Sequence, residues 1–128
     1  MTRITPNDDQ IREFAAAPDD GPVVMLNLLK FRGGDPTAYG RYGEPVLKMI
    51  DDTGGRLLWR GRADQILIGD PDESWDAVLL VEYPSRHAFL EMTSTPEYSE
   101  AHRHREEGLE RTVVVACTPA ESAIAEVQ

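Results

Sequence analysis

The segment from Tyr98 to Leu109 has the most suggestive spacing of chemically useful side chains in the chain. At about 100° per residue of an α-helix, Tyr98, His102, Arg105 and Leu109 fall within one narrow stripe, and His104 points away from it. The pattern predicts that His102 and Arg105 face inward. There an arginine could hold an anionic oxygen and a histidine could move a proton. The alternative for either histidine is an ordinary solvated or hydrogen-bonded helix residue.

Three more polar side chains stand in apolar segments that are predicted to be strands. Asn27 lies in the middle of Val23–Phe31 and could orient a substrate carbonyl, or it could simply satisfy backbone groups. Arg60 could clamp a carboxylate or an enolate, with a surface or interface ion pair as the alternative. Glu82 could act as a general base, although it could equally pair with Arg60 or Arg105.

Tyr42 and Tyr98 complete the set of residues predicted to bind a ligand, and no metal is expected. His102 and His104 are two residues apart on a predicted helix, so they lie on different faces and cannot chelate one ion together. The spacing Asp70-x-Asp72-x-Ser74-x-Asp76 imitates the start of a calcium loop. However, Trp75 stands where that loop needs glycine, and Val81 stands where it needs glutamate. There is no phosphate-binding glycine motif either, so no cofactor is predicted.

The stretch Val23–Phe31 (VVMLNLLKF) indicates how these side chains are positioned. Both of its alternating sets are apolar, whereas a strand covered on one face alternates apolar with polar residues. The strand therefore needs cover on both faces. The chain's own helices can supply one cover, and a second subunit is expected to supply the other.

Turn and cap residues divide the rest of the chain into elements. We expect a helix at 5–17 capped by Thr5, a helix from Thr37, a long strand over Arg56–Gly69 and a strand over Asp76–Tyr83. The remaining expectations are a helix capped by Ser85, a helix from Thr95 to about Glu110, a strand over Thr112–Cys117 that buries Cys117, and a loose tail at 119–128.

After the first helix, the order is β-α-β-β-α-β. It predicts an α+β fold, a ferredoxin-like protomer at about 22–118 with an extra N-terminal helix, in which both helices cover one face of an antiparallel sheet. The other sheet face is predicted to meet a partner's sheet, which makes a dimeric α/β barrel. No linker divides residues 1–128, so a single domain is expected.

Several motifs together resemble a known family. They are VVMLNLLKF, AYGRYGE, GGRLLWRG, IG-x-x-x-E-x-WD, VEYPSRHAFLEM, PEY, and HR ahead of the last strand. Across about Thr5 to Pro119 the chain is similar to uncharacterised-domain family 1330 of the dimeric α/β-barrel superfamily. The resemblance implies a homodimer with a cleft between sheet and helices. It also stresses the pair His104-Arg105. It implies no particular reaction, since fold analogy alone assigns none.

Composition limits the class of partner. The net charge is −10 and the basic residues are dispersed, which argues against nucleic acid. No apolar run approaches the roughly 20 residues that cross a bilayer, and the first residues resemble no signal peptide, so a cytoplasmic location is expected.

The leading hypothesis is a homodimer that binds an apolar or aromatic metabolite without a cofactor, as an oxygenase, isomerase or cyclase. In it, Arg105 and Arg60 hold an anionic oxygen, and Glu82 or a histidine moves a proton. The alternative is a non-catalytic ligand carrier or accessory module. Haem binding through His102 is a third hypothesis.

Overall fold

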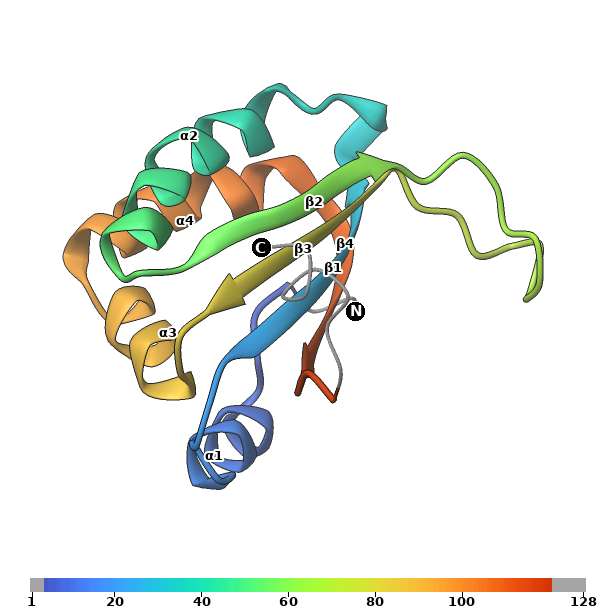
Figure 1. Ribbon diagram of the computed structural model, residues 1–128. Helices are drawn as coiled ribbons and strands as arrows, with labels where there is room; N and C mark the ends of the chain where they lie inside the picture. Colours follow the sequence, from blue (N-terminus) through green and yellow to red (C-terminus); the bar gives the residue numbers. More distant parts are fainter. Residues whose placement is uncertain (1–3, 121–128) are drawn as a thin grey trace.

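The computed structural model describes residues 4–120, in which one four-stranded sheet carries helices on one face (Figure 1). In chain order the elements are α1 (Asp8–Ala16), β1 (Val23–Phe31), the short 3-10 turn η1 (Arg32–Gly34), α2 (Thr37–Asp52), β2 (Arg56–Arg62), β3 (Ala77–Tyr83), α3 (Arg86–Thr93), α4 (Pro96–Gly108) and β4 (Leu109–Cys117). The strand order is β2-β3-β1-β4 and every neighbouring pair is antiparallel. The predicted ferredoxin-like α+β fold is confirmed.

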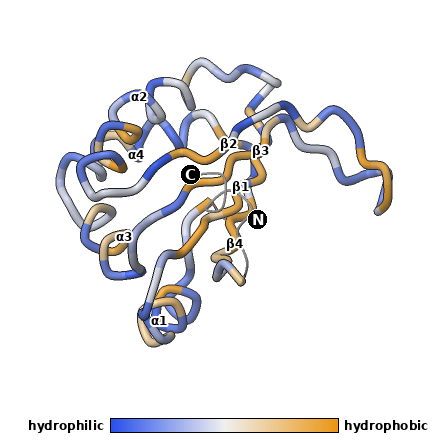
Figure 2. Tube along the Cα trace, viewed as in Figure 1, coloured by the Kyte–Doolittle hydropathy of each residue, from blue (hydrophilic) through white to orange (hydrophobic). Residues whose placement is uncertain are grey.

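The sheet has two faces that differ in what covers them. The helix face carries the row Arg60, Leu79, Asn27 and Val114 and, beside it, the row Leu57, Val81, Met25 and Ala116. The other face, here called the open face, carries the rows Trp59, Leu80, Leu26, Val115 and Gly61, Val78, Leu28, Val113. Trp59, Val113 and Val115 are 52%, 42% and 45% exposed there. The strands β1, β3 and β4 are the most apolar elements of the fold (Figure 2).

The helices pack closely at the junction of α2 and α4. A Cβ built on Gly108 would lie 2.7 Å from the backbone nitrogen of Tyr39 and 3.2 Å from the Cβ of Ala38. Only glycine allows the two backbones to approach this far. The contact holds α2 and α4 together as one layer above the sheet, with Tyr42, Val46, Ile50 and Ala101 in the core beneath.

Local caps set where the helices begin. The Ser85 side chain accepts from Ala88 N at 3.0 Å and that of Thr95 accepts from Tyr98 N at 3.1 Å, as the sequence predicts. The first helix begins later than predicted, because Asn7 and not Thr5 is its cap. Asn7 and Gln10 form a capping box in which each side chain bonds the other residue's backbone.

Two strand predictions also need correction. The strand predicted over Arg56–Gly69 ends at Arg62, since residues 63–69 find no strand to pair with and leave the sheet. The last strand begins earlier than predicted, at Leu109. Cys117 is half-buried on the open face, not part of the core. Of the predicted tail, residues 121–128 lie outside the described residues.

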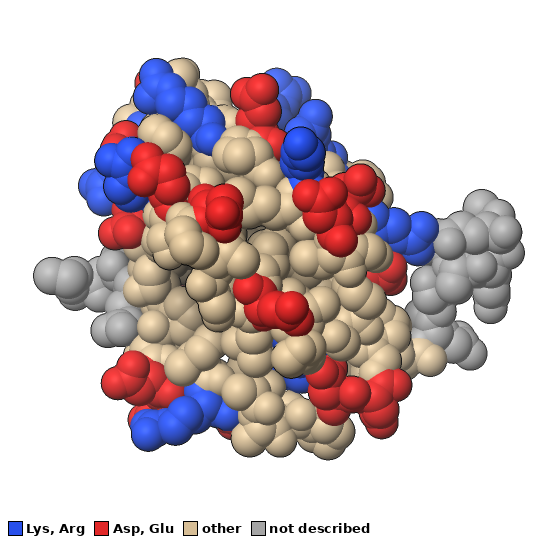
Figure 3. Space-filling model, turned by 90° about the vertical axis from the view of Figure 1, so that its left-hand side faces the viewer, with Lys and Arg blue, Asp and Glu red and all other residues tan. Residues whose placement is uncertain are grey.

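Charge is mixed over the surface. On the side shown in Figure 3, acidic and basic side chains stand among broad uncharged areas. Within residues 4–120, no helix combines the length and the apolar character that a membrane crossing requires.

Candidate functional site

A large cavity, here called the central cavity, lies between the helix face of the sheet and the helices. Its volume is about 1420 Å³. The row Arg60, Leu79, Asn27 and Val114 forms its floor, and residues of α1, α2 and α4 form its walls and roof. Val114 faces the helices but is 44% exposed, so the cavity is open to solvent. A cavity of this size can receive a metabolite-sized ligand.

Aromatic rings make up much of the cavity wall. Tyr39 and Tyr42 from α2 have ring centroids 5.2 Å apart, and Tyr42 and Tyr98 have centroids 5.9 Å apart in an edge-to-face arrangement. The hydroxyls of Tyr42 and Tyr98 lie 2.8 Å apart and share a hydrogen bond. A wall of this kind favours a planar or apolar ligand body.

Tyr39 and Tyr42 of this wall stay protonated at physiological pH. Burial raises the pKa of Tyr39 to about 12 and that of Tyr42 well above its ordinary value. Burial also raises the pKa of Tyr83, at the end of β3. Their hydroxyls are therefore available as hydrogen-bond donors rather than as negative charges.

Arg105 supplies a buried positive charge beside these rings. It is 7% exposed, its guanidinium lies 6.0 Å from the centre of the Tyr42 ring, and it donates to the carbonyl of Ile4. Among the described residues, no carboxylate forms an ion pair with it. A buried cation without a negative partner is costly, and an anion in the cavity would offset that cost.

His102 lies one helical turn before Arg105 and also lines the cavity. Its pKa is lowered, first by burial and then by the positive charge of Arg105, while Glu106 opposes the shift. Its Nε2 lies 3.6 Å from Glu106, and its Nδ1 is buried without a hydrogen-bond partner among the described residues. A neutral imidazole with an unused nitrogen is suited to accept a proton.

The floor adds two polar groups in one row. Asn27 donates from Nδ2 to the Met25 carbonyl at 3.1 Å. Arg60 is exposed and, among the described residues, forms no ion pair. The two residues are separated by Leu79 on β3, so their backbones are roughly 10 Å apart at about 4.8 Å per strand.

The cavity brings together most of the predicted site residues, namely Asn27, Tyr42, Arg60, Tyr98, His102 and Arg105. Two lie elsewhere. Glu82 is on the open face, where it accepts from Arg56 Nε at 3.2 Å, so it cannot act with Arg105 in the same chain. His104 is outside the cavity lining, with Nδ1 3.9 Å from Glu107.

Sequence reasoning missed part of the wall. Tyr39, Tyr83, Phe89 and Phe14 line the cavity and were not predicted to be site residues. Tyr39 stands three residues before Tyr42, so helical phase placed both on one face of α2 and could have nominated it. The rings of Phe14 on α1 and Phe89 on α3 contact each other, with their centroids 5.3 Å apart. No local sequence pattern indicates this contact.

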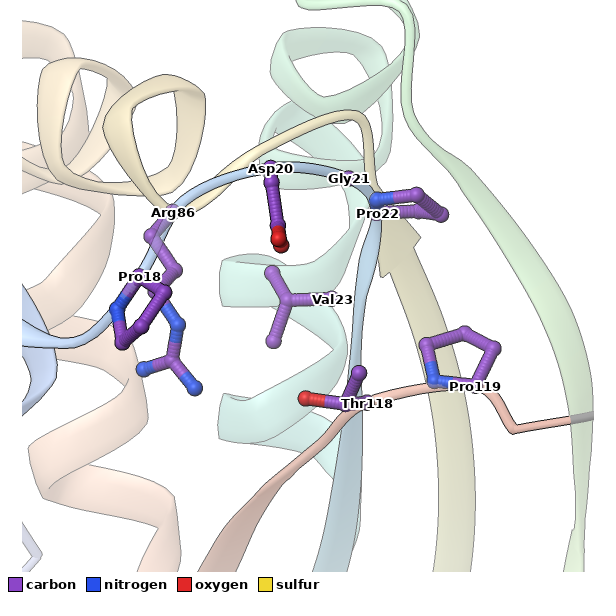
Figure 4. A pocket seen from close by; sticks show the side chains of 8 residues that line it. All are labelled: Pro18, Asp20, Gly21, Pro22, Val23, Arg86, Thr118 and Pro119. Carbon is purple, nitrogen blue, oxygen red and sulfur yellow. The ribbon is translucent and has the colours of Figure 1, made fainter.

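No metal centre is found in the described part of the chain, where no three metal-binding side chains gather. A second pocket, of about 280 Å³, lies at the start of β1 (Figure 4). Its lining comes from Pro18, Asp20, Gly21, Pro22, Val23, Arg86, Thr118 and Pro119. Arg86 is already used in packing, because it donates to the Phe14 carbonyl at 3.3 Å and lies 4.6 Å from the Phe14 ring centre.

Residues 27–118 match the family described as Domain of unknown function (DUF1330). The crystal structure of RPA0582, a protein of unknown function from Rhodopseudomonas palustris, is 34% identical with a TM-score of 0.89, over 95% of this chain and 100% of that one. No curated protein matches the sequence.

More distant solved structures share the fold. One is a dimeric protein of unknown function with a ferredoxin-like fold from Bacteroides fragilis, at 16% identity and a TM-score of 0.53, over 77% of this chain and 96% of that one. Another is SnoaB, a cofactor-independent oxygenase from Streptomyces nogalater, at 12% identity and a TM-score of 0.58, over 81% and 98%.

Proposed function

The chain belongs to the DUF1330 family, whose function is unknown, and we propose that it binds a small anion with an aromatic or apolar body in the central cavity. The ligand's body lies against the tyrosine wall. Its anionic group lies against Arg105, with Arg60 as a second cation at the other end of the floor. Asn27 and the tyrosine hydroxyls orient its remaining oxygens.

The observation that carries this proposal is the buried guanidinium of Arg105. Its neighbours are a backbone carbonyl and an aromatic ring, and neither neutralises its charge. An arginine placed in this way binds a carboxylate or enolate more strongly than a neutral group, because charge-assisted hydrogen bonds strengthen where water is excluded.

We further propose that the protein is an enzyme that moves a proton without a cofactor. The imidazole of His102 removes an acidic proton from the bound ligand, and the electron pair that remains is held as an enolate or phenolate beside Arg105. The place of His102 in the cavity lining and its lowered pKa, which keeps the imidazole neutral, support this step. SnoaB is a cofactor-independent oxygenase, and its distant likeness supports the fold but not a shared reaction.

The protomer is proposed to work as a homodimer that buries the open face. Two complete apolar rows on that face support the assembly, as does the dimeric relative from Bacteroides fragilis. Unpaired apolar surface of this extent is usual at interfaces between subunits.

Binding is tested by calorimetry with naphthalene-1-carboxylate and its neutral amide, naphthalene-1-carboxamide. We expect the wild type to prefer the carboxylate. We expect Arg105→Met to lose about ten- to a hundredfold in affinity for the carboxylate and little for the amide, as for other charge-assisted bonds. Arg103→Met is the matched control, because Arg103 lies on the same helix but pairs with Glu100 at the surface. Equal affinity of Arg105→Met and wild type for the carboxylate would rule out Arg105 as the anion partner.

Proton transfer is tested with phenylpyruvate, whose methylene protons exchange with heavy water through an enol. We expect the wild type to catalyse this exchange and His102→Gln to lose the catalysed part, while His104→Gln keeps it because His104 is outside the cavity. If the wild type binds naphthalene-1-carboxylate but does not speed the exchange, the carrier hypothesis replaces the enzyme hypothesis. If His102→Gln exchanges as fast as wild type, His102 is not the base.

A further inference from the structure

The connection between β2 and β3, residues 63–76, forms an arm that projects beyond the sheet (Figure 1). Its tip is apolar, as Figure 2 shows at the far right. Leu67 and Ile68 are 84% and 93% exposed, the highest values among the large hydrophobic residues of the described chain. Isolated exposed apolar residues are common, but two adjacent ones at the end of a long projection are not.

The base of this β2–β3 arm is held firmly by backbone and side-chain bonds. Asp76 N donates to the Leu29 carbonyl at 2.8 Å, and the Asp76 carboxylate accepts from Phe31 N at 2.8 Å. Ala63 N donates to the Asp76 carbonyl at 3.1 Å. The arm therefore has a defined direction, and its apolar tip has no cover within the described chain.

The returning limb of the arm lies on the side of the open face. Lys30 and Arg111 are paired across β1 and β4 on that face. Lys30 Nζ donates to Ser74 Oγ at 3.1 Å, and Arg111 donates to the Ser74 carbonyl at 2.6 Å. The Arg111 guanidinium also lies 4.3 Å from the ring centre of Trp75. The end of this limb nearest the sheet therefore borders the open face.

We propose that the β2–β3 arm reaches onto a second copy of this chain, which buries Leu67 and Ile68. The inference rests on the homodimer proposed above and adds a contact to it. Half of the arm, about seven residues at roughly 3.3 Å each, reaches about 20 Å, close to the width of a four-stranded sheet at about 4.8 Å per strand. In a two-fold dimer each arm makes the same contact, so the two protomers hold each other reciprocally.

A second copy fits this arm better than a membrane or a nucleic acid. The arm carries acidic residues on both sides of its tip, namely Asp64, Asp70, Asp72 and Glu73. These would be repelled by phosphate groups. The open face of the sheet is apolar, and every copy of the chain carries one. A second copy therefore offers an apolar surface against which Leu67 and Ile68 can pack.

The test measures dimer dissociation by analytical ultracentrifugation. We expect the double variant Leu67→Asp/Ile68→Asp to raise the dissociation constant at least tenfold, with an unchanged circular dichroism spectrum, because both side chains are exposed in the protomer. Glu73→Gln, in the same arm, is the matched control and should leave the dissociation constant unchanged. Val115→Asp, on the open face, should abolish the dimer.

The outcomes separate the two proposals. If the wild type is dimeric and Val115→Asp is monomeric but the arm variant dissociates as the wild type does, the arm contact is overturned and the sheet dimer stands. If the wild type is monomeric at every concentration, both the sheet dimer and the arm contact fail.

Hydrogen exchange tests the arm contact independently, without substitutions. Residues 64–69 should exchange more slowly at concentrations where the dimer forms, and equal rates in monomer and dimer would overturn the arm contact.

Discussion

At the scale of single residues, the site depends on two neighbours on α4 that affect each other's charge. Arg105 is buried without an ion pair among the described residues, and its positive charge disfavours a second positive charge on His102. One residue is therefore kept charged and the other neutral at the same wall of the cavity. Groups whose environments separate their protonation states in this way are typical of sites that bind an anion and move a proton.

His102 gives a pH-dependent stability with a definite sign. Its pKa in the folded protein is lowered from the ordinary value of 6.5, chiefly by burial. Below that value the unfolded chain binds more protons than the folded one, so protonation favours unfolding. This residue's contribution is complete above about pH 6.5 and is lost as the pH falls from there toward the folded pKa.

We expect the wild type to lose more unfolding free energy than His102→Gln between about pH 7.5 and pH 5.5. Urea denaturation of both proteins at the two pH values measures the difference. Other titrating groups are common to both proteins and largely cancel in the comparison. A parallel loss in the two proteins would contradict the buried, neutral state of His102.

Helical phase was the sequence signal that worked best at this scale. It placed Tyr98, His102 and Arg105 on one face of α4, and all three line the cavity. Strand parity held information that the prediction for Glu82 did not use. Glu82 stands between Val81 and Tyr83, both buried on the helix face, so alternation alone puts it on the open face. Arg60 and Leu57 share a face only because of an irregularity in the pairing of β2, which has no sequence signature.

At the scale of elements, the close contact of α2 with α4 fixes the roof of the cavity. A methyl group on Gly108 would collide with the backbone of Tyr39, the residue that begins the tyrosine wall. Moving α2 away from α4 would therefore displace Tyr39 and Tyr42 from the ring of Tyr98. Helix packing and site geometry are coupled through this one glycine.

Gly108→Ala should lower the free energy of unfolding by about 1–3 kcal/mol, as overpacking does elsewhere. Gly40→Ala is the matched control on α2, because a Cβ there meets nothing within 4 Å. That substitution should stabilise the protein by up to about 1 kcal/mol through helix propensity. Thermal or urea unfolding checks both, and an equal effect of the two substitutions would mean that the helices adjust without strain.

Element types were predictable where local chemistry decides them. The caps Ser85 and Thr95 and the two-sided apolar strand Val23–Phe31 all stand as predicted. The strand predicted to run to Gly69 was wrong because Ile66, Leu67 and Ile68 have strand propensity but no partner strand. Pairing is a property of the whole sheet, and β-propensity alone does not reveal it.

At the scale of the whole molecule, one sheet separates two tasks. Its helix face supplies the floor of a cavity, and its open face supplies the surface for the proposed assembly. The two apolar parity sets of β1 predicted this division, because a strand with two apolar faces requires two covers. The arm could not be predicted in the same way, since its base depends on contacts between Ser74 and side chains of β1 and β4.

The separation of the two faces also sorts the fluorophores of this protein. All four tyrosines line the central cavity, whereas both tryptophans lie outside it, Trp59 on the open face and Trp75 in the arm. Tyrosine emission and absorbance should therefore follow occupation of the cavity. Tryptophan emission should follow assembly. The unlabelled protein thus carries separate optical signals for its two surfaces, which can be read in a single titration.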